Sequence, residues 1–150
     1  MKKILALLIC LNLGWKIQGQ ETKDHEGVTK ALLNYVEGFY EGDTLKLIQC
    51  LKPSLHKIGY WKNKKTGEYD YEGQMTYVQA IEFARNVMIK KSFAKQDAPK
   101  KVIVLDIQEK TAAGKVYAWW GIDYVLLSKD NDKWMIEQVL WEGPPAKENK

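Results

Sequence analysis

The chain has 150 residues, with 23 basic and 19 acidic side chains, six tryptophans, eight tyrosines and three phenylalanines. Three of the basic residues, Lys2, Lys3 and Lys16, lie before residue 20 in a stretch without any acid, so the rest of the chain is nearly neutral. A near-neutral domain lacks the positive charge that holds nucleic acid, and we expect no nucleic-acid partner.

Residues 1–19 have the pattern of a secretory signal peptide. Two lysines follow the initial methionine, residues 4–13 are apolar apart from Asn12, and polar residues follow Gly19. An apolar run of about ten residues is typical of a signal peptide and is too short to span a bilayer, which takes about 20. We predict cleavage after Gly19, export to the periplasm or the exterior, and no stable membrane insertion afterwards. The alternative is an uncleaved anchor or a buried N-terminal helix.

Two helices are predicted after a polar lead-in over residues 20–26. Apolar residues then recur at steps of three and four, which is the spacing of one helix face. They are Val28, Ala31, Leu32, Tyr35, Val36, Phe39 and Tyr40. Gly42 can end this helix in a left-handed conformation, Asp43 can cap a short second helix, and Pro53 is expected to end that helix. Cys50, beside the apolar face of the second helix, is expected in the core.

A hairpin and a third helix follow. Residues 56–61 and 69–71 are predicted as strands around a turn at 62–67, because aromatic residues flank a polar, glycine-containing turn. Thr76 and Gln79 have the spacing of a capping box, so a third helix is expected from Thr76. Its apolar face is expected to contain Tyr77, Ile81, Ala84 and Met88, extended by Val78.

The last third of the chain has the pattern of β-strands. Strands are predicted over residues 101–109, 115–127 and 133–141. Turns as short as those at 110–114 and 128–132 force antiparallel neighbours. The middle strand is apolar or aromatic on both faces. This favours a sheet covered by helices on one side and by a second copy on the other, and we predict a homodimer through the sheet.

Helices followed by long antiparallel strands define the α+β class. We predict three N-terminal helices packed on a strongly curved antiparallel sheet. The domain is predicted over residues 27–142, and a charged tail occupies residues 143–150. Gly121, inside the longest predicted strand, is expected to produce a bend that helps the sheet curl.

Three segments resemble one known family. Residues 34–43, with the sequence NYVEGFYEGD, are similar to the first-helix signature of the lumazine-binding family in the nuclear transport factor 2-like superfamily, also called cystatin-like or SnoaL-like. Residues 51–57, and residues 123–127 with 134–136, fit the same family more loosely. The resemblance implies a cone of helices and bent sheet around a pocket, commonly paired into dimers. That superfamily includes isomerases, dehydratases and non-enzymes, so the fold alone does not determine a function.

His56 and Asp123 are the candidate catalytic residues. Asp123 lies within an apolar and aromatic strand, where a carboxylate is costly unless it is hydrogen-bonded or faces a pocket. His56 can act as a general base or donate to a ligand. Together they would suit proton abstraction or dehydration. The structural alternatives are a partly exposed histidine and a carboxylate that pairs with Arg85 or a lysine or caps a backbone group.

Aromatic residues are the candidate ligand contacts. Tyr40, Trp61, Trp119 and Trp141 are predicted to stack on a flat heterocycle, while most other rings belong to the core. Two histidines and a single cysteine beyond residue 19 are too few for a closed zinc site, so no metal and no cofactor are expected.

The leading functional hypothesis is therefore an exported, non-catalytic module that binds a small apolar or aromatic molecule. One alternative is an acid–base isomerase or dehydratase of the SnoaL-like type. Another is an envelope dimer that binds other proteins.

Overall fold

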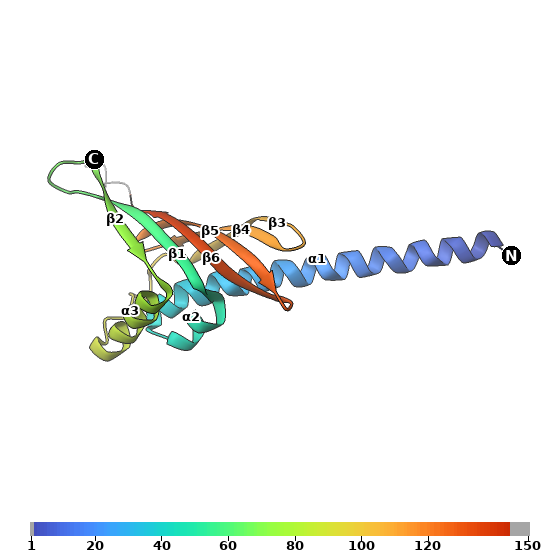
Figure 1. The fold of residues 1–150 in the computed structure, drawn as a ribbon, viewed down its shortest axis with the longest axis horizontal. Helices are drawn as coiled ribbons and strands as arrows, with labels where there is room; N and C mark the ends of the chain where they lie inside the picture. The colour runs from blue at the N-terminus through green and yellow to red at the C-terminus, as the bar shows by residue number, and fades with distance from the viewer. Residues whose placement is uncertain (1, 145–150) are drawn as a thin grey trace.

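The computed structural model describes residues 2–144, with only the backbone described for residues 2–20. Three helices and six strands make one α+β unit, in which α1, α2 and α3 lie on one side of a six-stranded sheet (Figure 1). The elements are α1 (Lys2–Glu41), α2 (Thr44–Cys50), β1 (Leu51–Lys62), β2 (Tyr69–Met75), α3 (Tyr77–Lys90), β3 (Lys101–Ile107), β4 (Thr111–Ala118), β5 (Gly121–Asp130) and β6 (Lys133–Glu142).

Helix α1 starts much earlier than the periodicity predicts. It runs unbroken from Lys2, so residues 20–26, predicted as a lead-in, are helical. Its first part projects beyond the sheet, whereas its second part lies against it (Figure 1). The predicted apolar face is buried there, with Val28, Leu32 and Tyr35 fully inaccessible. Across the described residues, no helix has an apolar stretch long enough to cross a membrane.

The predicted helix boundaries at Gly42 and Asp43 are confirmed. Gly42 has a φ of 67°, and a Cβ at this position would lie 2.6 Å from the backbone nitrogen of Met88. Only glycine therefore permits both the left-handed turn and the close approach of α3. The Asp43 side chain accepts hydrogen bonds from the backbone N–H groups of Leu45 and Lys46, at 2.9 and 3.1 Å. These contacts begin α2 directly after α1.

Two details of the helices differ from the predictions. Helix α2 ends at Cys50 and β1 starts at Leu51, so Pro53 lies within the strand and does not end the helix. In α3 the capping box of Thr76 is confirmed, but Met88 and Val78 are exposed. The buried face consists of Ala80, Ala84 and Val87. These small side chains let α3 pack closely on α1.

The sheet has the order β2-β1-β6-β5-β4-β3. The predicted β1–β2 hairpin is confirmed, and the pairings among β3 to β6 are antiparallel as expected. Strand β1, however, lies parallel to β6, with Ile58 opposite Leu140. No turn joins these two strands directly, so no local sequence signal set their relative direction.

The predicted strand 115–127 is in fact two strands. Strands β4 and β5 pair through a tight turn at Trp119 and Trp120, and Gly121 begins β5 instead of bending a longer strand. This turn changes which residues share a face. Val116 lies opposite Asp123, and both are buried, although a single strand would place them on opposite faces.

Candidate functional site

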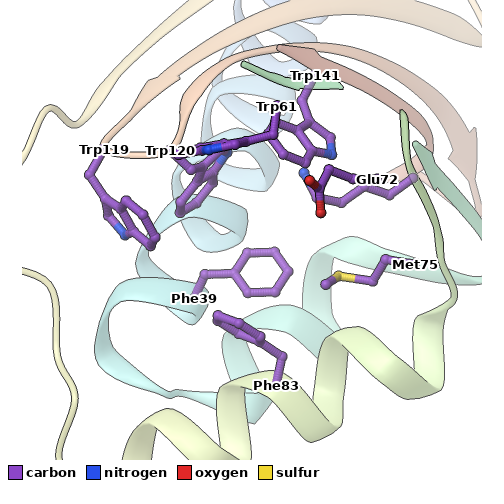
Figure 2. Close-up of a pocket in the computed structure, with 9 residues that line it drawn as sticks. Phe39, Trp61, Glu72, Met75, Phe83, Trp119, Trp120 and Trp141 are labelled. Carbon is purple, nitrogen blue, oxygen red and sulfur yellow. The ribbon is translucent and has the colours of Figure 1, made fainter. Parts of the chain in front are cut away.

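A pocket of about 400 Å³ lies between the sheet and the helices (Figure 2). Aromatic rings form most of its wall, and they come from α1, α3, β1, β6 and the β4–β5 turn. The lining residues are Phe39, Lys57, Trp61, Glu72, Met75, Phe83, Trp119, Trp120 and Trp141. Four of the chain's six tryptophans therefore meet at one cavity.

The aromatic wall is held in place by ring-to-ring packing. Trp120 packs edge-to-face against Phe39, with ring centroids 5.8 Å apart, and Trp61 lies 6.1 Å from Trp141. Gly59, paired with Trp141 across β1 and β6, leaves room for that indole, because a Cβ on Gly59 would lie 2.2 Å from it. Edge-to-face pairs add stability beyond their buried area, so the cavity has a preformed aromatic surface.

A buried polar network closes the sheet side of the pocket. Asp123 is fully buried, and its carboxylate accepts hydrogen bonds from the Tyr35 hydroxyl and from Nε1 of Trp120, the latter at 2.8 Å. Nζ of Lys57 donates to the Tyr35 oxygen at 2.7 Å and to Asp123 at 3.3 Å. The carboxylate thus has three donors, which offset the cost of burying its charge.

Lys57 and Trp120 are the members of this network that line the pocket, and Lys57 carries the charge. Its Nζ lies 5.3 Å from the ring centroid of Trp141 and 5.7 Å from that of Trp120, which are cation–π distances. Burial lowers the pKa of Lys57, and the nearby Asp123 carboxylate opposes this shift. Burial, followed by the charge of Asp123, raises the pKa of Tyr35 well above its usual value.

Three of the four predicted ligand contacts, Trp61, Trp119 and Trp141, line the pocket. Tyr40 does not belong to this lining. Its hydroxyl donates to the carbonyl of Pro99 and accepts the backbone N–H of Trp119 at 2.8 Å. Tyr40 therefore positions the β4–β5 turn, and burial raises its pKa.

The structure does not bring His56 and Asp123 together. Successive side chains of a strand point to opposite faces, so His56 is exposed on the outer face while Lys57 points inward to Asp123. Among the structural alternatives for Asp123, the partner is a lysine and not Arg85. The two candidate catalytic residues consequently do not share the pocket.

Sequence reasoning missed Lys57 and Glu72, which are the charged groups of the pocket. For Lys57 a signal existed, because it alternates with the buried residues Leu55 and Gly59 in β1. A lysine in phase with buried positions needs a partner or a cavity. For Glu72, which is exposed on β2, the sequence held no such signal.

The described part of the chain contains no cluster of three His, Cys, Asp or Glu side chains able to hold a metal ion. Cys50 is buried in the core, as expected, and burial raises its pKa to about 12. A thiol with so high a pKa is a poor nucleophile.

The helices and sheet have the nuclear transport factor 2-like fold. Solved nuclear transport factor 2-like proteins of unknown function from Silicibacter pomeroyi and Shewanella baltica are both 14% identical to this chain, with TM-scores of 0.59 and 0.60. The matches cover 81% and 83% of this chain and 96% and 97% of theirs. A cystatin-like protein from Nostoc punctiforme is 12% identical, with a TM-score of 0.53 over 82% of this chain and 92% of its own.

The sequence model of the family described as "Putative lumazine-binding" matches residues 23–142. The chain belongs to this family. No curated protein matches the sequence. The match starts before residue 27, the predicted start of the domain, and so includes part of the predicted lead-in.

Proposed function

We propose that the protein is an exported binding protein for a small, flat aromatic molecule held in the pocket, and that it does not turn this molecule over. The observation that carries the proposal is the convergence of Trp61, Trp119, Trp120 and Trp141 on one cavity. Aromatic side chains lining a concave site with few polar groups are typical of small-molecule sites. The family description, which names lumazine, supports the same class of ligand.

The non-catalytic part of the proposal rests on the state of Asp123. Its carboxylate is fully buried and already accepts hydrogen bonds from Tyr35, Trp120 and Lys57. A general base must reach the proton that it removes, directly or through one water. Asp123 is separated from the cavity by its own donors, and His56 is exposed on the other face of the sheet.

Tryptophan fluorescence tests the ligand directly, because most indoles of the chain line the site. Titration with lumazine, a pteridinedione, should quench the emission with saturation. Trp119→Ala should weaken binding, whereas Tyr124→Ala, on the exposed outer face, should not. Equal weakening by the two substitutions would argue against this pocket. Absence of saturable quenching by any flat heterocycle would remove the proposal.

Export is the second part of the proposal, and it is supported by the basic start and apolar run of residues 1–19. Cleavage after Gly19 would leave Asp24 in place, which is buried and pairs with Lys129 at 2.6 Å. N-terminal sequencing of the protein recovered outside the cytoplasm should begin at Gln20. Recovery of the uncleaved chain only from the cytoplasm would contradict export.

A homodimer through the sheet is the third part. Tyr124, Leu126 and Leu140 are about half exposed on the outer face, and Tyr124 lies opposite Leu140 in the register of β5 and β6. An apolar patch of this kind is typical of an interaction surface. Sedimentation equilibrium should give a dimer that Leu140→Lys dissociates, whereas Val78→Lys on α3 should not. A monomeric wild type that binds another protein would favour the alternative of an envelope partner.

A further inference from the structure

The two charged groups of the pocket have opposite hydrogen-bonding character and different depths. Lys57 is buried at the sheet side, and its ammonium can only donate. Glu72 is exposed on β2, and its ionised carboxylate can only accept. Figure 2 shows the Glu72 side chain directed from its strand toward the cavity. The aromatic pocket therefore combines a buried donor with an exposed acceptor.

Both groups have hydrogen-bonding capacity left for a ligand. Lys57 uses two of its three N–H groups on Tyr35 and Asp123, and no further acceptor is found among residues 21–144. Within the same range, Glu72 makes no hydrogen bond and no ion pair, so its carboxylate is available. Because Asp123 already balances the charge of Lys57, this lysine offers a directed hydrogen bond and little net attraction for an anion.

A symmetric or purely apolar ring would leave the third Lys57 N–H with no partner other than the ring faces of Trp120 and Trp141. An unmade hydrogen bond of a buried group is costly, and the cost is larger for a charged group. The same ring would leave Glu72 hydrated, at little cost, because it is exposed. Lys57 should therefore discriminate between ligands more strongly than Glu72 does.

We infer that the pocket selects a flat aromatic ligand with a neutral acceptor oxygen on its buried edge and an amine on its more exposed edge. The acceptor, such as a ring carbonyl, lies against Lys57 and the amine against Glu72. This inference rests on the proposed function, because it presupposes that the pocket binds a ring. It adds the polarity of the ligand and the direction in which it enters.

Three naphthalenes that share one ring system test the inference by calorimetry. They are 6-amino-2-acetylnaphthalene, 2-acetylnaphthalene without the amine, and 2-aminonaphthalene without the acetyl carbonyl. In the wild type, the bifunctional probe should bind about tenfold more tightly than the probe without the carbonyl, and severalfold more tightly than the probe without an amine. Lys57→Met should remove the first preference only, and Glu72→Met the second only.

Gln74→Met provides the matched control, because Gln74 is exposed on the same strand as Glu72 and does not line the pocket. It should keep both preferences. If Lys57→Met fails to fold, the affinities of the three probes for the wild type and for Glu72→Met still test the inference. Equal affinities for the three probes would overturn the inference and leave ring binding intact. Absence of binding by all three would remove the proposed function as well.

Discussion

The ammonium of Lys57 meets the carboxylate of Asp123 at 3.3 Å, with the two side chains 8% and 0% exposed. Lys57 belongs to β1 and Asp123 to β5, and β6 lies between these strands in the sheet. The ion pair therefore spans β6 on the helix-facing side of the sheet. It links the β1–β2 hairpin to strands β3–β5 at the sheet side of the pocket.

Breaking this pair from one side should destabilise the fold strongly. Asp123→Asn leaves the Lys57 charge buried without its counterion, and we expect a loss of about 3–5 kcal/mol in the free energy of unfolding. Urea denaturation followed by circular dichroism measures the loss. As a control, Glu137→Gln removes a partly exposed partner of Lys52 and should cost at most about 1 kcal/mol. Similar losses for both variants would contradict a buried pair.

Gly59→Ala should close or distort the pocket without replacing any residue that lines it. The added methyl would lie 2.2 Å from the Trp141 indole, so the ring must move. We expect a shift in tryptophan emission and at least a tenfold loss of ligand affinity. His56→Ala, on the outer face of the same strand, should change neither. Unchanged affinity in Gly59→Ala would show that the position of Trp141 does not matter for binding.

The pKa of Tyr35 predicts a specific alkaline loss of stability. Its pKa is raised in the folded state above the ordinary value of 10.0, so the unfolded chain loses this proton first as the pH rises. The contribution of the Tyr35 proton to the free energy of unfolding is complete below pH 10.0. It is lost as the pH rises from there through the folded-state pKa. The free energy of unfolding of Tyr35→Phe should therefore fall less than that of the wild type between about pH 9 and about pH 11.

Tyr71→Phe is the matched control for this experiment, because Tyr71 is exposed on β2. It should follow the wild-type curve of unfolding free energy against pH. If Tyr35→Phe follows the same curve, the Tyr35 proton does not contribute to the alkaline loss.

Cys50 should resist thiol reagents in the folded protein. It is fully buried, so a reagent cannot reach its sulfur. Burial also raises its pKa to about 12, so little of the reactive thiolate forms at neutral pH. Iodoacetamide at neutral pH should leave the Cys50 peptide unmodified, as read by mass spectrometry, and concentrated urea should expose it. Rapid labelling without urea would indicate that α2 opens easily.

Asp24 should anchor α1 to the hairpin between β5 and β6. Its carboxylate accepts from Nε1 of Trp134 at 3.0 Å and pairs with Lys129 at 2.6 Å. Asp24→Asn should cost about 1.5–3 kcal/mol, since hydrogen bonds to charged groups are of that size. Glu26→Gln, on the exposed side of α1, should be nearly neutral. A neutral Asp24→Asn would mean that packing alone holds the helix.

Local signals in the sequence predicted the helices and most of the sheet. Gly42, Asp43 and Thr76 act through their own backbone neighbours, so their patterns transfer directly to the structure. The turn at Trp119 and Trp120 was missed because bulky aromatic residues lack the usual chemistry of a turn.

The candidate site was predictable only in part. Trp61, Trp119 and Trp141 were predicted because their large flat rings suit stacking on a heterocycle, and all three line the pocket. The partnership of Lys57 with Asp123 depends on the parallel pairing of β1 with β6, which joins segments far apart in the chain. No spacing rule within either segment contains that information.

The position of β6 has a consequence for the order of folding. It is the last strand in the described chain, yet it lies inside the sheet and pairs with β1 and β5 on its two sides. Until β6 arrives, the β1–β2 hairpin and the β3–β5 meander have no shared edge. The chain must therefore be nearly complete before its two halves can join, and pairings between such distant segments form slowly.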